Sequence, residues 1–522
     1  MTPTAEKPKE IISINPATGE EVGRIQGLGA DEVRARVASA RQAFVLWSRT
    51  SFAERAEMVL KMRRYLLDHI DEIAEIISKD NGKPRLEALS SEIYPICDLM
   101  SWFADNTARL LKPKPVGIGV WNLFLRRSVI HYDPMGVVGV ISPWNYPFSI
   151  PLGEIVMALM AGNCVVHKAS SSTPFVGKAI ADVVNAGGLP DGVFHDLPGS
   201  SAVGTAMIDA KVDKILFTGS VGVGRKIMEM AAKHLTPVSL ELGGKDPMIV
   251  LADADLDVAS SGAVWGAFCN SGQTCASVER VYVQEPIAEE FIRLVVEKTK
   301  ALRQGCGPGD DCDVGSMTTE GQLKEVEEQM EDARKRGAKI LTGGERDGSR
   351  PGWFYKPTVL THVDHGFRCV MEETFGPTMP IMTFKDEDEA VRLANDSPFG
   401  LTASVWTRMT SRGFALARRI RAGTVTINDC VFTHGVCQTP WGGPGDSGIG
   451  RTHSYMGLME VVEPHHIHVN PLTFQKNFWW YPYGGELYGL LKSLTRTLTK
   501  GGWWGILQSV PNLIRIALIK KR

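Results

Sequence analysis

The sequence lacks cysteine pairs at the spacing typical of metal sites, a strong excess of one charge and a secretory signal. Its nine cysteines are scattered, with no C-x-x-C spacing, so we expect free thiols in a reducing compartment and no metal site. The opening MTPTAEKPKE has no apolar core, which argues against a secretory signal. The formal net charge of −2 gives no global reason to expect a nucleic-acid partner. These absences favour a cytoplasmic protein.

The sequence also lacks an uninterrupted apolar run long enough to span a membrane. Residues 135–166 come nearest, but they contain Asn145, Glu154, Asn163 and three prolines. A spanning helix needs about 20 predominantly apolar residues. The stretch therefore predicts a buried strand, a loop and a helix.

The chain is long, and expected strands and helices alternate along much of it. At 522 residues it is too long for one hydrophobic core, so two or three domains are expected. Apolar spacing predicts helices at about 30–48, 52–79 and 85–110. Short β-branched runs then alternate with helical stretches, and a second alternation spans about 246–440. Such alternation is typical of parallel sheets buried on both faces, so the expected fold class is α/β with two parallel-sheet domains.

A glycine-rich stretch, FTGSVGVGRKIM (217–228), follows an expected strand and opens an expected helix. Glycines at 219, 222 and 224 let the backbone approach a ligand, and a helix N-terminus offers N–H groups to a pyrophosphate. The order is G-x-x-G-x-G, not G-x-G-x-x-G. Taken alone, the motif fits a phosphate site and a plain strand-to-helix turn about equally.

Two residues combine reactive chemistry with unusual surroundings. Glu241 ends an apolar strand beside a Gly-Gly turn, where a carboxylate is costly unless it is paired or its pKa rises. It is either a structural salt-bridge partner or a general base. Cys275 ends the stretch FCNSGQTC, close to a helix expected to begin near Asp257. Its small neighbours leave room for a substrate carbon to reach sulfur, although a lone cysteine is more often a packing residue.

Nine longer motifs follow in a fixed order: PWNYP (143–147), KASSSTP (168–174), FTGSVGVGR (217–225), LELGGKDP (240–247), SGQTCAS (271–277), EETFGP (372–377), FGLTASVWT (399–407), GTVTIND (423–429) and PWGGPGDSGIGR (440–451). On these motifs the chain resembles the aldehyde dehydrogenase superfamily over roughly residues 10–470. It is similar to the hydrolytic, NAD(P)-dependent members. The resemblance implies oxidation of an aldehyde to its carboxylic acid through a cysteine thiohemiacetal and thioester.

The resemblance assigns this chemistry to three residues. Cys275 matches the nucleophile, Asn145 with the Cys275 backbone N–H matches the oxyanion donors, and Glu241 matches the base that activates water. Cys269 is expected to be a packing residue. Relatives that use coenzyme A or acyl phosphates typically lack the glutamate, so water is the expected acceptor. The alternative is a catalytically silent binding or structural protein on the same fold, whose signature would be loss of one of the three residues.

The resemblance also implies NAD or NADP as cofactor. Many NAD-preferring members carry Glu three positions beyond Lys168, where this chain has Ser171. Without that carboxylate, a 2′-phosphate meets no charge conflict, so NADP is admissible. The residues implied to bind the cofactor are Trp144, Lys168, Ser171, Gly199, Gly219, Ser220, Gly224, Glu373 and Phe375.

The aldehyde itself is less defined. Trp102, Phe103, Trp265 and Phe268 suggest an apolar channel, although such residues are as common in ordinary cores. We expect an apolar aldehyde, with a long-chain fatty aldehyde as one candidate. The expected division of the chain is a cofactor-binding domain (1–115 and 135–244), a catalytic domain (245–452), a small β oligomerisation extension (116–134 and 453–470) and a tail (471–522).

The resemblance implies a homodimer or homotetramer, because the family makes its subunit contact through a small β extension, and the matching strands here are expected to have exposed edges. The tail, 471–522, holds eight Lys and Arg against Glu486 alone, with leucines spaced on one helical face. Aromatic, basic, amphipathic helices lie at membrane surfaces, so we expect peripheral contact with the cytoplasmic membrane. Packing of the tail against a partner subunit is the alternative. The leucines in question are Leu487, Leu490, Leu491, Leu494 and Leu498.

Overall fold

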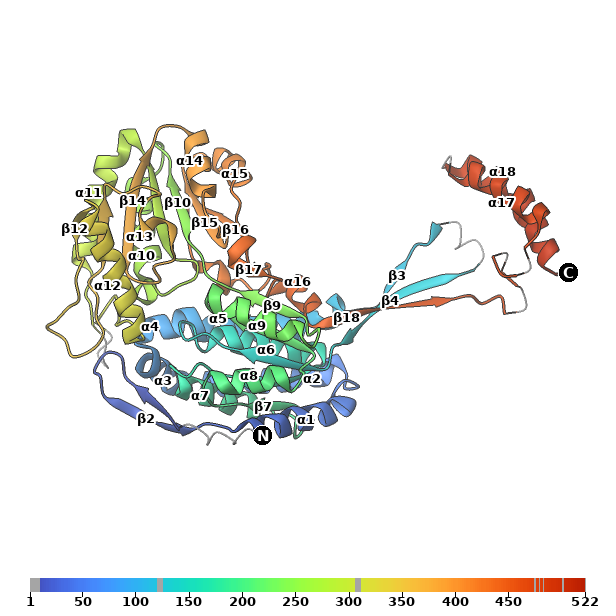
Figure 1. The fold of residues 1–522 in the computed structure, drawn as a ribbon, viewed down its shortest axis with the longest axis horizontal. Coiled ribbons are helices and arrows are strands. Elements are labelled where there is room, and N and C mark those ends of the chain that lie inside the picture. The colour runs from blue at the N-terminus through green and yellow to red at the C-terminus, as the bar shows by residue number, and fades with distance from the viewer. Residues whose placement is uncertain are drawn as a thin grey trace. The chain divides into compact units, whose positions relative to one another are not determined.

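The computed structural model describes residues 10–119, 125–305, 311–473, 476–477, 479–481, 483–499 and 502–521. The chain forms two compact units, coloured along the sequence in Figure 1. Unit 1 comprises Met1–Leu110 with Pro134–Val462, and unit 2 comprises Leu111–Asp133 with Glu463–Arg522. Each unit is described by itself.

The first large sheet of unit 1 has the strand order β17-β9-β8-β5-β6-β7. All neighbours are parallel except β17, which pairs antiparallel with β9. Right-handed crossovers need helices between parallel strands, and α6 to α9 supply them. The bounds are β5 Val137–Ile141, α6 Ser149–Ala161, β6 Cys164–Lys168, α7 Pro174–Asn185, β7 Phe194–Asp196, α8 Ser201–Asp209, β8 Lys214–Thr218, α9 Val221–Ala232, β9 Val238–Glu241 and β17 Gly448–Ile449.

The second large sheet has the order β12-β13-β14-β11-β10-β15-β16, parallel except for β12 against β13. Figure 1 shows it among the yellow to orange helices of unit 1. The predicted α/β class with two parallel sheets is confirmed. The bounds are β10 Asp246–Val250, α10 Leu256–Phe268, β11 Val278–Gln284, α11 Ala288–Ala301, α12 Glu320–Lys335, β12 Lys339–Thr342, β13 Thr358–Thr361, α13 Arg368–Met371, β14 Thr378–Phe384, α14 Glu387–Asn395, β15 Thr402–Trp406, α15 Thr410–Ala417, β16 Thr424–Ile427 and α16 Ser454–Met459.

The N-terminal part of unit 1 is a helical layer preceded by a two-stranded sheet. The predicted helix 52–79 is wrong as one element, because the chain breaks at His69, which ends one helix and begins the next. The third predicted helix begins with a short turn and a π-helical segment at Ala88–Ile93. The bounds are β1 Glu10–Ile14, β2 Glu21–Gln26, α1 Ala30–Trp47, α2 Phe52–Asp68, α3 Ile70–Asn81, α4 Arg85–Glu87 and α5 Tyr94–Leu110.

Unit 2 combines a three-stranded sheet, in the order β18-β4-β3, with two C-terminal helices. The strands are β3 Lys114–Val116, β4 Arg127–Pro134 and β18 Val462–Val469, and the helices are α17 Gly485–Leu498 and α18 Gly502–Lys521. Residues 120–124 of the predicted extension, and Lys500 and Arg522 of the tail, lie outside the described residues.

The tail helices form a hairpin. The predicted leucine face of α17 does not face outward, because Leu487 and Leu494 are buried against Ile516 of α18. Pro511 lies inside α18 and does not end it. In the described part of the chain, no helix has the length and hydropathy needed to cross a membrane.

Candidate active site

Cys275 lies just after a strained turn that ends α10, the helix predicted to begin near Asp257. Asn270, Ser271 and Gly272 have φ values of 49°, 57° and 71°, so three successive residues adopt the left-handed region. Non-glycine residues rarely do so, and such strain persists only where neighbours enforce it. A Cβ on Gly272 would stand 2.2 Å from the Gly376 carbonyl oxygen, so only glycine fits.

Gln273 is the neighbour that enforces the turn. Its side chain is fully buried and donates to the Asn270 carbonyl oxygen at 3.0 Å. Its Oε1 accepts from the Thr318 backbone N–H at 2.8 Å. Both ends of the amide are therefore satisfied, which fixes the turn against a second segment.

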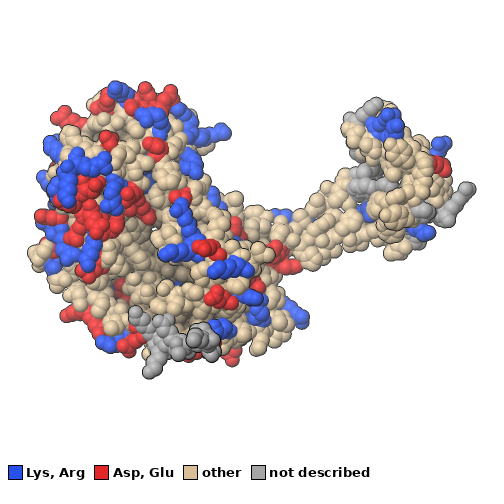
Figure 2. All heavy atoms as spheres, in the orientation of Figure 1, with Lys and Arg blue, Asp and Glu red and all other residues tan. Residues whose placement is uncertain are grey.

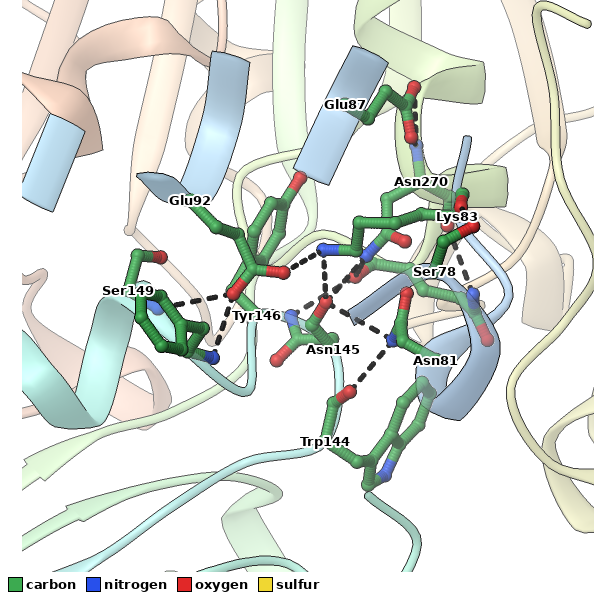
Figure 3. A network of polar contacts seen from close by, with 12 residues as sticks. Ser78, Asn81, Lys83, Glu87, Glu92, Trp144, Asn145, Tyr146, Ser149 and Asn270 are labelled. Atoms are coloured by element: carbon green, nitrogen blue, oxygen red, sulfur yellow. Dashed lines mark hydrogen bonds and ion pairs between the residues drawn. The ribbon is translucent and has the colours of Figure 1, made fainter. Parts of the chain in front are cut away.

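Asn145 lies in the loop after β5, with only 4% of its surface exposed. Its Nδ2 donates to the Gln273 carbonyl oxygen at 3.0 Å. The Asn145 carbonyl oxygen accepts from Lys83 Nζ at 2.9 Å and from Asn270 Nδ2 at 2.9 Å, as Figure 3 shows. These bonds tie Asn145 to the turn that carries Cys275. The structure thus brings together two of the three predicted catalytic residues.

Beneath Asn145 lies an ion pair that sequence reasoning did not single out. Lys83 Nζ is 2.6 Å from Glu92 Oε1, and both side chains are fully buried. Glu92 Oε2 accepts from the backbone N–H groups of Phe148 and Ser149, at 2.8 and 3.1 Å, where α6 begins (Figure 3). Removing one partner of such a pair typically costs about 3–5 kcal/mol, because the other charge stays buried. The pair therefore fixes the loop between β5 and α6.

Cys275 lines two pockets, which we call pocket A and pocket B. Pocket A has a volume of about 450 Å³ and a mostly apolar wall. Of the residues predicted for an apolar channel, it includes Trp265; Trp102, Phe103 and Phe268 are not in its wall, and Phe103 and Phe268 are core residues. Cys269, predicted to pack in the core, also lines it. Its wall includes Tyr94, Tyr146, Ile150, Val431, Phe432 and Trp441.

Pocket A contains no lysine or arginine among its described lining residues. The acidic side chains are Glu87 and Asp98. Burial raises the pKa of Glu87 to about 7 and lowers the pKa of His434 to about 4, so His434 is neutral at neutral pH. The pocket offers no cation to a charged aldehyde.

Pocket B has a volume of about 360 Å³ and shares Cys275 with pocket A. Gly219 and Ser220 line it where β8 gives way to α9, whose first turn has no side-chain cap. Phe375 meets Trp144 edge to face, with ring centroids 5.3 Å apart. Glu373 lines the wall and accepts from the Gly244 N–H at 3.0 Å.

Four other predicted cofactor residues lie outside the described wall of pocket B. Lys168 ends β6 and is buried, which lowers its pKa to about 8 although Asp196 partly opposes this. Ser171 is exposed in the following turn. Gly199 and Gly224 are close-packed, because a Cβ would meet Val203 and Leu242 respectively.

Glu241, at the end of β9, lines neither pocket in its described position. It is 4% exposed, and its carboxylate faces Gly442. Burial raises its pKa well above the ordinary value, and the Glu154 carboxyl adds to the effect. Burial is likewise the largest cause that raises the pKa of the Cys275 thiol, and the nearby Asp246 carboxyl is the second largest. The thiol therefore needs a base or a bound partner before it can react as a thiolate.

Known proteins resemble this chain in sequence and fold. A profile of the aldehyde dehydrogenase family matches residues 3–467. A Methylomonas sp protein named 4,4'-diapolycopene aldehyde oxidase is 39% identical over 478 residues, covering 92% of this chain and 89% of its own. The chain belongs to the aldehyde dehydrogenase family. The resemblance drawn from the motifs is confirmed.

Other relatives extend the comparison. A Mycobacterium ulcerans protein, provisionally named succinate-semialdehyde dehydrogenase [NADP(+)] 2, is 38% identical over 461 residues, covering 87% of this chain and 86% of its own. The crystal structure of an NAD-dependent aldehyde dehydrogenase from Sinorhizobium meliloti has a TM-score of 0.84 at 37% identity, covering 88% of this chain and 91% of that one. Family members with different substrate and cofactor names thus match to similar extents.

Proposed function

We propose that this aldehyde dehydrogenase oxidises an aldehyde to its carboxylic acid with NAD or NADP. The observation that carries the proposal is that Cys275 lines pockets A and B together. An aldehyde in pocket A and a cofactor in pocket B would then meet at the sulfur. The proposed catalytic residues Cys275, Asn145 and Glu241 are all present, so nothing favours the catalytically silent alternative.

The first step is attack of the Cys275 sulfur on the aldehyde carbon, which forms a carbon–sulfur bond and an alkoxide. Asn145 is positioned to stabilise that charge. Its amide has two N–H bonds, and one is used by the Gln273 carbonyl, which orients the group. The second N–H is left for the oxyanion, together with the Cys275 backbone N–H.

The residues of pocket B fit a dinucleotide. The first turn of α9 presents backbone N–H groups, and a Cβ on Gly222 would meet nothing within 4 Å, so a phosphate can approach the backbone. Gly219 and Ser220 would hold the pyrophosphate, and Glu373 and Phe375 the nicotinamide ribose and ring. The bound cofactor supplies a hydride acceptor. Lys168 and Ser171 are proposed to contact the adenosine ribose.

Glu241 is proposed to activate the water that releases the acid from the thioester. Its raised pKa makes it a stronger base once it is ionised. The test is Glu241→Gln: it should produce one equivalent of reduced cofactor per site in a burst, followed by slow turnover. Equal loss of burst and steady rate would make Glu241 structural instead.

Pocket A favours an apolar aldehyde, such as a long-chain fatty aldehyde. A substrate with a carboxylate, such as succinate semialdehyde, would meet Glu87 and Asp98 without a described cation. The name of the Methylomonas relative refers to a 4,4'-diapolycopene aldehyde, and that of the mycobacterial relative to succinate semialdehyde. For this chain, the apolar wall of pocket A favours an apolar aldehyde, as in the name of the Methylomonas relative, over succinate semialdehyde.

We also propose a homodimer or homotetramer assembled through unit 2. All residues of β18 after Val462 are exposed, and an exposed strand of this length favours pairing with another chain. Light scattering should give at least a dimer at concentrations where the enzyme is active. A monodisperse monomer under those conditions would contradict the assembly.

Unit 2 is further proposed to contact the cytoplasmic membrane surface through α18. Trp504, Leu507, Val510, Ile514 and Leu518 are 41–78% exposed and lie three or four residues apart, on one helical face. The opposite face packs against α17. In the view of Figure 2, unit 2 shows few acidic residues, whereas both charge signs cover unit 1. An apolar face beside basic residues suits anionic lipid.

The membrane contact can be tested by flotation with liposomes, with and without anionic lipid. The full chain should float with anionic liposomes at low salt, and Leu507→Gln with Ile514→Gln should weaken this. Exchanging the exposed polar Gln508 for Ala is the matched control. Recovery of the full chain in the soluble fraction would refute the contact, and loss of the oligomer on truncation after Asn470 would favour packing against a partner subunit.

A further inference from the structure

Glu154 is a carboxyl group in an otherwise uncharged helix. All residues of α6 are buried, and Glu154 is 4% exposed. A buried carboxylate costs several kcal/mol unless it is neutralised or paired, so its presence here needs an explanation. The steps proposed above leave Glu154 without a role.

The geometry places Glu154 next to the proposed base. Thr218 Oγ1 donates to Glu154 Oε1 at 3.5 Å. Thr218 is in turn the register partner of Glu241 in the parallel pair β8 and β9. Paired residues of neighbouring strands point to the same face, with strands about 4.8 Å apart. The carboxyls of Glu154 and Glu241 therefore occupy the same layer above the sheet.

Both groups have unused hydrogen-bonding capacity. Glu154 Oε2 and both oxygens of Glu241 are buried without a hydrogen bond of ordinary geometry to a described residue. Burial raises the pKa of Glu154 to about 8, so it is largely neutral at neutral pH. A neutral carboxyl has an O–H to donate, whereas a carboxylate can only accept.

Other groups near Glu241 do not neutralise it fully. Arg451 and the Thr452 backbone N–H lower its pKa, and Glu460 raises it. Glu460 is itself satisfied by Lys214 Nζ at 2.9 Å and Ser239 Oγ at 2.7 Å. Desolvation and the Glu154 carboxyl are the two largest influences on the pKa of Glu241, and both raise it.

We propose that Glu154 is a positioning residue for Glu241, with the two carboxyls titrating as an electrostatically coupled pair. The inference rests on the proposed role of Glu241 in hydrolysing the thioester. In the resting acyl-enzyme the pair carries one proton and one negative charge. When water adds to the thioester carbon, its proton passes to Glu241, so the pair becomes neutral. The carbonyl re-forms, the carbon–sulfur bond breaks to a Cys275 thiolate, and one proton returns from the pair to the thiolate.

Electrostatic coupling between the two carboxyls predicts a coupled titration. Two interacting carboxyls lose their protons in two macroscopic steps that belong to the pair. In the acyl-enzyme Cys275 carries the acyl group and does not titrate. The single-turnover rate of deacylation should therefore rise with pH in two steps, first as the pair becomes a monoanion and then as it becomes a dianion with Glu241 a stronger base.

The test compares this pH profile in the wild type and Glu154→Gln. The variant should keep its burst of reduced cofactor but show one ionisation fewer. The nearby carboxyls of Asp246 and Glu373 remain in both proteins, so their contribution cancels in the comparison. Asp80→Asn is a matched control, because Asp80 is a buried carboxyl bonded to Ser13 and two backbone N–H groups, and its profile should equal that of the wild type.

Superimposable profiles for the wild type and Glu154→Gln would overturn the inference, as would a wild-type profile that rises in a single step. Thr218→Val keeps both carboxyls while removing the hydroxyl that bonds Glu154 Oε1, so it should retain two steps. If Glu241→Gln deacylates as fast as the wild type, the proposed base is wrong. That outcome is distinct from an unchanged profile in Glu154→Gln.

Discussion

Pockets A and B share Cys275 but differ in what forms their walls. Half of the residues that line pocket A are aromatic or aliphatic, and its described charges are acidic. Pocket B combines side chains with backbone at Gly219, Ser220 and Gly243, at the ends of parallel strands. Backbone N–H groups recognise a phosphate whatever the side chains are, whereas a side-chain wall changes with each substitution. A substitution is therefore expected to change the ligand preference of pocket A more readily than that of pocket B.

The largest expected effect comes from the residue common to both pockets. Cys275→Ala should lower turnover by ~10⁴-fold or more, because removing a nucleophile removes the covalent path. Cofactor binding should persist, because most of the wall of pocket B is unchanged. Steady-state assays and cofactor fluorescence check the two parts. Activity near that of the wild type would show that the Cys275 sulfur takes no part in the reaction. The two pockets would then not share a reactive residue.

A charge reversal in pocket A should change the substrate without changing the cofactor. Asp98 lies on α5 and accepts from Gln438 Nε2 at 3.3 Å. Asp98→Arg should raise kcat/KM for succinate semialdehyde relative to a long-chain aldehyde by about tenfold, since a hydrogen bond between charged groups contributes about 1.5–3 kcal/mol. Asp98→Asn, which only removes the acid, should give a smaller change. An unaltered ratio would mean that the aldehyde does not occupy pocket A.

A charge added at residue 171, which is proposed to contact the adenosine ribose, should act on the cofactor alone. Ser171→Glu should raise the Michaelis constant for NADP roughly fivefold over that for NAD, because like charges near solvent repel by about 1 kcal/mol. Ser171→Gln keeps the size without the charge and should leave the ratio as it is. Equal effects on both cofactors would show that residue 171 does not face the ribose.

Local patterns in the sequence predict much of the fold. Helix α10 was expected from Asp257 and begins at Leu256, and the glycine-rich stretch 217–228 does connect β8 to α9. Alternating apolar runs predicted both parallel sheets. These features depend on neighbours within a few residues of one another, so a window of sequence contains the information.

Contacts between distant segments were not predictable in this way. Lys83 and Glu92 look like surface charges, yet they form a buried pair beneath Asn145, because the residues just before α4 and the π-helical segment Ala88–Ile93 fold against the loop after β5. The leucine face of α17 looked available for lipid, but α18 covers it. In the sequence, Gln273 is notable only for its position between a glycine and a threonine. The structure of the strained turn shows what its side chain binds.

The central claim is that Cys275 carries the substrate covalently between the two pockets. It is tested most directly by mass spectrometry of Glu241→Gln mixed with aldehyde and cofactor, where slow hydrolysis should leave the acyl-enzyme in place. The account predicts an added mass equal to the acyl group, located on the peptide that contains Cys275 and absent when the cofactor is omitted. An unmodified Cys275 in enzyme that has released one equivalent of reduced cofactor per site, or an acyl group on another residue, would contradict it.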